Sequence, residues 1–371
     1  MPRIRWLQTS DVHLRADRPE RRRALELAFG AAEAHAADGI LIAGDLFDRA
    51  HDAASERAAV RELIEAFAPR PVVLVPGNHD AEAYGDETDF GANGVVLSRT
   101  PYTRALVNGV DLVGLPYQHG RTAAECLTGL ACEPRQTILV GHATVMDGGG
   151  AFAGEGEDGA YMPIAVGDVL KRFSYAALGH LHSGRNLIRR DGERLVAYAG
   201  SPAAHSRREV GPRGVLLVDF ESGVGVLGHE FLALPMPYYE RVEVSCVPGG
   251  EEEAIAQLAR EASALRKPNL QVLARLSGVS TESEAALREA ATTALARAWK
   301  RPAGAGAPAG TAEIPEPVIE LHVASYAALA QTPVVGEFVS RLVASGKAGD
   351  DPRLLETALR LGLGAFLESL P

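Results

Sequence analysis

Short apolar runs alternate with long amphipathic stretches in the first part of the chain. Arg3–Thr9, Gly39–Ala43 and Val72–Val75 are short and largely apolar, which is typical of strands buried on both faces. Between them, Pro19–Ala37 and Ala53–Phe67 are rich in Ala and Leu and predict helices. This succession of strand and helix predicts a parallel α/β sheet.

The pattern continues with more strands than helices. Arg104–Val107 and Val110–Leu115 flank Asn108-Gly109, a strong signal for a β-hairpin. A helix is expected near Val166–Phe173. Further strands are expected over Gln136–Val140, Tyr175–Leu178, Asn186–Arg189, Leu195–Tyr198, Gly214–Phe220 and Val224–Phe231. We therefore predict an α/β fold with four layers, α/β/β/α, in which two sheets lie face to face.

A smaller β/α unit is predicted after Met236-Pro237-Tyr238. Its expected elements are strands over Arg241–Val247, Leu270–Leu276 and Val318–Val323, and helices over Glu251–Leu265 and Glu282–Trp299. Thr332–Pro371 predicts two terminal helices that either fold back onto the protein or dock a partner. We therefore divide the chain into a larger domain at residues 1–235, a cap domain at 236–330 and a C-terminal helical segment at 331–371.

Composition narrows the class of protein. Of the 371 residues, 46% are hydrophobic, yet no apolar run approaches a membrane span and no signal peptide is expected. Cys126, Cys132 and Cys246 show no metal-ligand spacing and predict reduced thiols in the cytoplasm. The net charge of −11 gives no global basic field for nucleic acid, although a local patch remains compatible with DNA binding.

Polar residues cluster where the expected strands end. Asp11, Asp45 and Asn78 are spaced by 34 and 33 residues, about one strand–helix–strand unit each. The candidate ligands are Asp11, His13, Asp45, Asn78, His142, His180 and His182. Oxygen and nitrogen ligands without a thiolate suit Mn²⁺, Fe²⁺ or Zn²⁺. Seven are too many for one ion, so we expect two ions roughly 3.5–4 Å apart that clamp a phosphate for in-line displacement.

The remaining histidines have a simpler interpretation. His35 falls within an expected helix, and His229 and His322 fall within expected strands, so ordinary structural roles are predicted. The other three, His51, His119 and His205, lie in loops able to reach the site. Each is expected to be an ordinary loop residue, with His205 the strongest exception.

The series Asp-x-His, Gly-Asp-x-x-Asp, Gly-Asn-His-Asp, Gly-His and Gly-His-x-His resembles the signature of calcineurin-like metallophosphoesterases. Ser10–His13, Gly44–Asp48, Ala177–His182 and Ala199–Pro202 are further similar to the DNA double-strand-break repair exonuclease branch, of the SbcD type and its YhaO-like relatives. The resemblance covers roughly the first 240 residues well and the remainder loosely.

The resemblance implies a role for each site residue. One ion would be held by Asp11, His13, Asp45 and His182, and the other by Asp45, Asn78, His142 and His180. His79 would face the scissile phosphate and protonate the leaving oxygen or stabilise the transition state. Asp48 would hydrogen-bond the far nitrogen of His79. Asp80 is either a supporting residue or a turn residue.

The implied activity is a two-metal DNA phosphodiesterase, acting as a 3′–5′ exonuclease and single-strand endonuclease in double-strand-break repair. The resemblance implies two divalent ions, Mn²⁺ first, with Fe²⁺, Zn²⁺ or Mg²⁺ as alternatives. The expected partners are DNA, an SMC-like coiled-coil ATPase subunit and a second copy of the chain, with no membrane. Two alternatives stay open: a small-molecule phosphodiesterase or phosphatase, and a non-catalytic binding module.

Overall fold

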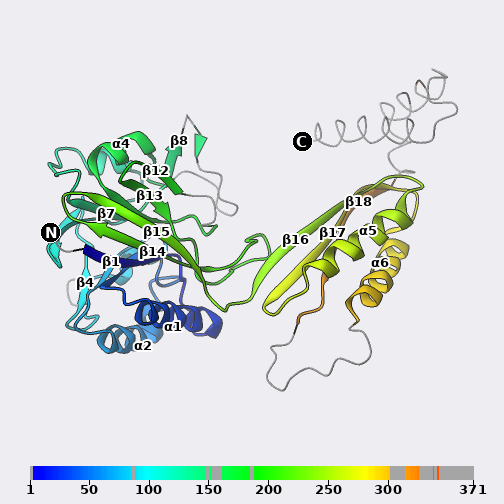
Figure 1. Cartoon of the computed structure of the whole chain (residues 1–371), viewed down its shortest axis with the longest axis horizontal. Coiled ribbons are helices and arrows are strands. Elements are labelled where there is room, and N and C mark those ends of the chain that lie inside the picture. Colours follow the sequence, from blue (N-terminus) through cyan, green and yellow to red (C-terminus); the bar gives the residue numbers. More distant parts are fainter. Residues whose placement is uncertain are drawn as a thin grey trace. The chain divides into compact units, whose positions relative to one another are not determined.

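The computed structural model divides the chain into two compact units, Met1–Tyr238 and Tyr239–Pro371 (Figure 1). It describes residues 3–85, 88–147, 150–151, 161–183, 188–300 and 314–325, together with Glu337 and Arg341. The C-terminal helices predicted at 331–371 lie outside the described residues apart from those two positions. None of the helices in the described ranges is both long enough and apolar enough to cross a membrane.

The first sheet of the first unit grows from the buried runs near the N-terminus. Its strands in spatial order are β15 (Gly225–Ala233), β14 (Gly214–Glu221), β1 (Arg3–Thr9), β2 (Gly39–Ala43), β3 (Val72–Val75) and β4 (Gly94–Val96). Strands β1 to β4 are parallel, whereas β14 pairs antiparallel with β1 and β15. The parallel strands are linked through α1 (Pro19–Ala34) and α2 (Ala53–Ala66), so the carboxyl ends of β1, β2 and β3 lie along one edge.

The second sheet contains the later strands. Their spatial order is β12 (Ile188–Asp191), β13 (Arg194–Tyr198), β11 (Tyr175–Gly179), β7 (Thr137–His142), β6 (Val110–Leu115) and β5 (Thr103–Val107). The hairpin predicted at Asn108-Gly109 is confirmed, since Val107 pairs with Val110 across it. Shorter elements are η1 (Ala81–Ala83), α3 (Ala123–Cys126), β8 (Val145–Asp147), β9 (Gly150–Ala151), β10 (Ile164–Ala165) and α4 (Val166–Arg172).

The alternation of side chains along the strands sets the layers. On β2, Ile40 and Ile42 pack in the cluster that includes α1 and α2 residues, whereas Leu41 and Ala43 pack between the two sheets. A third apolar cluster covers the other face of the second sheet with α3 and α4. These layers confirm the predicted four-layer α/β/β/α fold, with a core between the sheets and one on each outer face.

In its described residues up to Ser325, the second unit has a three-stranded sheet and two helices. Its strands are β16 (Tyr238–Cys246), β17 (Leu270–Ser280) and β18 (Val318–Ser325), with β17 and β18 parallel. Helix α5 (Glu251–Ala264) contacts β17, and α6 (Glu284–Trp299) contacts both α5 and β18. Apolar side chains such as Leu258 and Leu287 are buried, which explains why the helices remain on the sheet.

Candidate metal centre

The loops that follow β1 and β2 run side by side and bring three candidate ligands together. The Asp11 backbone N–H donates to the Gly44 carbonyl at 3.1 Å, and the His13 N–H donates to the Asp45 carbonyl at 2.9 Å. Asp11, His13 and Asp45 have φ values of 52°, 51° and 51°. Left-handed backbone at residues other than glycine is costly, so these loops are held in shape by their contacts.

Two glycines make room for the ligand side chains. A Cβ at Gly77 would overlap the Asp45 carboxylate, and a Cβ at Gly44 would overlap the His142 imidazole. Gly44 also has a φ of +90°, which L side chains rarely adopt. The Gly-Asp and Gly-Asn motifs therefore have a steric reason as well as a turn-forming one.

The Asp45 carboxylate lies at the middle of the cluster. Its Oδ1 accepts the His79 backbone N–H at 2.9 Å. Its Oδ2 lies 3.2 Å from His142 Nε2 and 3.6 Å from His13 Nε2. One oxygen is thus fixed by the backbone while the other faces imidazoles from two directions.

Three imidazoles are oriented by oxygen atoms behind them. The Nδ1 atoms of His142, His182 and His13 lie 3.0 Å from the Ala43 carbonyl, 3.1 Å from Glu209 Oε1 and 3.4 Å from Asp48 Oδ1. Engaging Nδ1 in this way directs Nε2 to a metal ion, the usual arrangement of ligating histidines. His13 Nε2 is buried and has no hydrogen-bond partner, a cost that a bound cation would remove.

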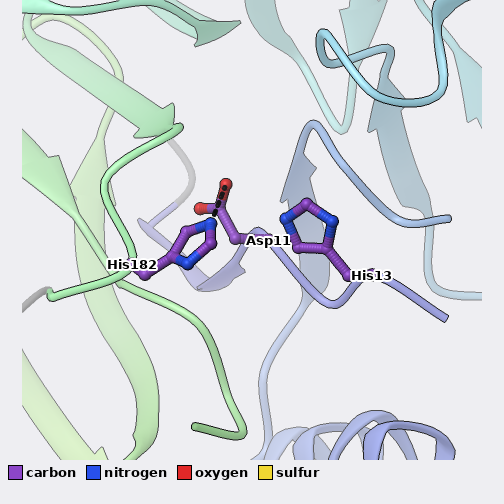
Figure 2. Close-up of side chains that lie close together, drawn as sticks. All are labelled: Asp11, His13 and His182. Atoms are coloured by element: carbon purple, nitrogen blue, oxygen red, sulfur yellow. Dashed lines mark ion pairs between the residues drawn. The ribbon is translucent and has the colours of Figure 1, made fainter. Parts of the chain in front are cut away.

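The other candidate ligands join the same cluster. Asn78 Oδ1 lies 2.9 Å from His142 Nε2. The His180 backbone N–H donates to both Asp11 carboxylate oxygens, at 3.0 and 3.1 Å, and its ring packs against His142 with centroids 5.4 Å apart. Asp11 Oδ1 lies 4.0 Å from His182 Nε2, the contact drawn in Figure 2. The structure therefore brings all seven sequence-predicted ligands together.

Among the described residues, three groups of side chains have ligand atoms close enough for one ion. They are Asp11, His13 and His182; His13, Asp45 and His79; and Asp11, Asp45 and His142. The groups share members, so the donors form one continuous site rather than separate ones. Their oxygen and nitrogen chemistry fits divalent metal ions.

The electrostatics of the metal-free cluster favour charged groups. Burial opposes ionisation of Asp45, but the imidazoles of His142, His13 and His79 outweigh it and hold the pKa of this carboxyl well below its usual range. Burial likewise acts to lower the pKa of His142, but the charge of Asp45 raises it to about 10. Without a metal, the Asp45 carboxylate is therefore negatively charged beside a protonated His142, and a cation that binds His142 would have to displace this proton.

Asp48 differs from its expected role. The atom 3.1 Å from His79 Nδ1 is the Asp48 backbone carbonyl. Its carboxylate instead lies 3.4 Å from His13 Nδ1 and accepts hydrogen bonds from Arg15 and Arg21, at 3.2 and 3.0 Å. The guanidinium groups draw the side chain away from His79, so Asp48 orients His79 through its backbone and His13 through its carboxylate.

Asp80, whose role the sequence left open, holds two site loops together. Its carboxylate is buried and accepts backbone N–H groups from Leu46, Phe47 and Gly77 at 2.8, 3.1 and 2.8 Å. Burial and the charge of Asp45 raise the pKa of Asp80 to about 7. Asp80 therefore ties the loop after β2 to the turn after β3.

Two residues near His182 complete the site. Glu209 is 4% exposed, and its Oε2 accepts the His205 backbone N–H at 2.9 Å while Oε1 contacts His182. Burial opposes its charge, but His182 lowers the pKa of Glu209 to about 2. The His205 ring lies 4.9 Å from that of His13 and 5.0 Å from that of His182, and burial lowers the pKa of His205 to about 3.

His205 was expected from its loop position as the strongest exception among the loop histidines, whereas Glu209 was not predicted. Glu209 lies in an irregular loop that no strand-end motif marks, and the only nearby signal was Ala199-Gly-Ser-Pro202. Of the other histidines, His229 and His322 lie in strands as expected, while His35 follows α1, which ends three residues earlier than predicted. His51 and His119 line a cavity beside His79.

The sequence was also compared with known proteins. Residues 4–184 match the calcineurin-like phosphoesterase family. The chain is 29% identical over 205 residues to the DNA double-strand break repair protein Mre11 of Sulfurisphaera tokodaii, covering 50% of each chain. It is 25% identical over 269 residues to the SbcD component of the nuclease SbcCD of Escherichia coli, covering 59% of this chain and 66% of that protein.

A third relative is the uncharacterized metallophosphoesterase YhaO of Bacillus subtilis, 26% identical over 246 residues, which cover 64% of this chain and 59% of that protein. The chain thus spans about half to two thirds of the length of these relatives. The family match contains all nine sequence-predicted site residues, and the donor cluster fits divalent metal ions. The family match and this donor cluster together support a metal-dependent hydrolase: the chain carries a calcineurin-like metallophosphoesterase domain.

Proposed function

We propose that the protein is a two-metal phosphodiesterase that cleaves DNA, as a 3′–5′ exonuclease and single-strand endonuclease in double-strand-break repair. The observation that carries the two-metal site is the position of Asp45 Oδ2, within 3.6 Å of Nε2 atoms from both His13 and His142. One carboxylate oxygen between two sets of donors is what a pair of ions with a shared ligand needs.

In our proposal the donors form two sets that share Asp45. Asp11, His13 and His182 would complete one set, and Asn78, His142 and His180 the other. When bound, the two ions, Mn²⁺ in our proposal, would supply positive charge to the phosphate and lower the pKa of the attacking water. Asp48 and Glu209 hold His13 and His182 with Nδ1 engaged, so these rings present Nε2 without rearrangement.

In this proposal His79 is the general acid that protonates the leaving group. With its Nδ1 proton donated to the Asp48 carbonyl at 3.1 Å, Nε2 is the atom that would deliver a proton to the leaving oxygen. Its backbone N–H is bound to Asp45 Oδ1, which fixes the position of the residue beside the shared carboxylate. Distance alone would also let His79 bind a metal, and this alternative is tested below.

The choice of DNA as substrate rests on the named relatives, two of which are a double-strand break repair protein and a nuclease component. We further propose that the 236–330 domain contacts DNA and that an SMC-like coiled-coil ATPase, and a second copy of the chain, are partners in the cytoplasm. The net charge of −11 favours the rival substrate class, a small phosphodiester, because a DNA-binding surface gains from basic charge.

One assay separates these substrates. Purified protein with Mn²⁺ is incubated with single- and double-stranded DNA labelled at either the 3′ or the 5′ end, with bis-para-nitrophenyl phosphate in parallel. Release of labelled mononucleotide from the 3′ end, weakening steeply as salt rises, would support the DNA proposal. Intact DNA alongside hydrolysed bis-para-nitrophenyl phosphate would refute it and assign a small-diester enzyme.

A further inference from the structure

A cavity of about 670 Å³ opens beside the metal centre. One wall is the loop after β2, which contributes Arg49 and His51, and another is the turn after β3 with His79. The loop after β6 contributes Tyr117 and His119. The residue assigned to the leaving group thus lies in the lining of this cavity. Its size suits a ligand much larger than a single phosphate.

One positively charged side chain of the cavity lining, Arg49, has no ion pair among the described residues. Nearby, Arg15 and Arg21 are paired with the Asp48 carboxylate at 3.2 and 3.0 Å. Arg49 is exposed, and within the part of the chain that the structure describes its guanidinium has neither an ion pair nor a hydrogen bond. Glu82 is the acidic residue of the lining and lies beyond ion-pair distance of Arg49. A guanidinium without a partner is available to bind the oxygens of a phosphate.

The loop after β6 offers flat surfaces to the cavity. Tyr117 is half-buried, and its Oη lies 3.3 Å from His119 Nδ1, so the two rings are linked to each other. Aromatic rings near a basic side chain are typical of sites that hold nucleic-acid bases without reading their sequence. The free guanidinium can bind a phosphate, and the two rings can pack against a base. Together these groups are complementary to a nucleotide.

Building on the proposed metal-centre chemistry, we propose that this cavity is a nucleotide subsite. It binds the nucleotide that adjoins the scissile phosphate, and Arg49 binds the second phosphate of that nucleotide. The subsite would make the enzyme prefer a chain of phosphodiesters over a single one, which the donor cluster alone cannot do. A substrate with one phosphate would gain nothing from Arg49.

The test compares inhibitors of bis-para-nitrophenyl phosphate hydrolysis by the Mn²⁺-loaded protein. Thymidine 3′,5′-bisphosphate should inhibit about tenfold more strongly than thymidine 3′- or 5′-monophosphate, since one charge-assisted contact is added. In Arg49→Ala this advantage should vanish, in Arg49→Lys most of it should remain, and in Glu82→Gln it should grow. Hydrolysis of bis-para-nitrophenyl phosphate without inhibitor should be unchanged in all three.

Arg135→Ala is the matched control. Arg135 is exposed, also has no side-chain partner among the described residues, and precedes β7 at the end opposite His142. It should keep the full bisphosphate advantage.

A second readout needs no hydrolysis: the binding of a labelled oligothymidylate in EDTA, followed by its fluorescence anisotropy. The slope of the logarithm of the binding constant against the logarithm of the salt concentration should become shallower by about 0.7 in Arg49→Ala. This change corresponds to the loss of one contact with a single-strand phosphate.

Equal inhibition by bisphosphate and monophosphates in the wild type, or an advantage that survives in Arg49→Ala, would overturn the subsite. Loss of bis-para-nitrophenyl phosphate hydrolysis in Arg49→Ala would also overturn it, because Arg49 would then act at the scissile group. Failure of the DNA proposal gives a different result. The wild type would leave DNA intact, while the inhibitor comparison, which uses no DNA, would still decide whether Arg49 binds a second phosphate.

Discussion

Single hydrogen-bond acceptors set the orientation of the imidazole rings in the candidate metal site. His142, His182 and His13 all have Nδ1 engaged, but their acceptors are a backbone carbonyl, Glu209 and Asp48. A carbonyl fixes the ring without adding charge, whereas a carboxylate also raises the basicity of the ligating nitrogen. Substitution of the carboxylates therefore tests the arrangement without removing a ligand.

Glu209→Gln should weaken metal binding about 10- to 100-fold, the usual effect of changing a residue that orients a ligand. The amide would keep the size of the side chain but lose the charge that supports His182. Equilibrium dialysis with Mn²⁺ measures the effect, and Asp168→Asn, which alters an exposed pair with Lys171, is the control. Unchanged affinity, with an unchanged metal-free melting temperature, would show that Glu209 does not act through His182.

His79→Asn should keep the bound metal but lose roughly 10²–10⁴-fold in hydrolysis, the range that general acid catalysis supplies. The reason is that proton delivery is removed while the donor sets around Asp45 stay intact. Elemental analysis of the purified variant, together with its rate on bis-para-nitrophenyl phosphate, measures both parts. A variant that has lost metal would make His79 a ligand, as its place in a donor group with His13 and Asp45 allows.

The sequence predicted the ligands better than the residues behind them. Asp11, Asp45 and Asn78 follow buried strands, and parallel strands must end at the same edge, so their meeting follows from topology. Glu209 belongs to a loop without periodicity, so nothing in the chain indicates where it returns. The Asp48 carboxylate could not be placed either, because its direction depends on competition between His79 and two arginines.

At the scale of elements, strand and helix positions followed closely from hydrophobic pattern. The bounds of β1, β2 and β3 agree with the prediction, and α2 and α4 end one residue earlier than expected. The elements that were missed, such as β4, β10 and α3, have two to four residues. Periodicity needs a longer window than that, and such elements depend on neighbours to form.

Glu251 at the start of α5 ties this helix to the end of β17. Its Oε1 accepts hydrogen bonds from Ser280 Oγ, Thr281 N–H and Thr281 Oγ1 at 2.9, 2.9 and 3.0 Å. Burial opposes ionisation, but these bonds prevail and lower the pKa of Glu251. A lowered pKa means that the stabilisation is present above the unfolded-state pKa, about 4.3, and is lost as the pH falls through the folded-state value.

Glu251→Gln should therefore destabilise the second unit by roughly 1–2 kcal/mol at neutral pH, and the difference from wild type should shrink below about pH 4. Urea unfolding followed by Trp299 fluorescence in a Trp6→Phe background measures this unit, since the chain has two tryptophans. Glu253→Gln, which removes an exposed pair with Arg260, is the control. A difference that is constant from pH 3 to 7 would contradict the role of the charge.

At the scale of the whole molecule, the candidate metal ligands lie in the first unit, and we expect the second unit to affect which substrates are bound. All buried apolar clusters described for the sandwich draw on residues between Ile4 and Met236, and every candidate ligand lies in the same unit. The second unit has its own sheet and helices and supplies no donor to the candidate metal groups found among the described residues. Catalysis should then belong to the first unit, with the second needed for a long substrate.

Two truncated variants test this division. A variant ending at Tyr238 should fold, bind metal and hydrolyse bis-para-nitrophenyl phosphate at a rate within about threefold of the full chain, because its cores and donors are complete. Its cleavage of DNA should fall at least tenfold, because the proposed DNA contacts of residues 236–330 are absent. A variant ending at Gln331, which removes only the predicted C-terminal helices, should keep both activities but no longer bind the proposed ATPase partner. Circular dichroism and melting curves must first show that each variant is folded. If the shorter variant aggregates, the units depend on each other for stability; if it cleaves DNA as well as the full chain, the second unit has no part in binding DNA.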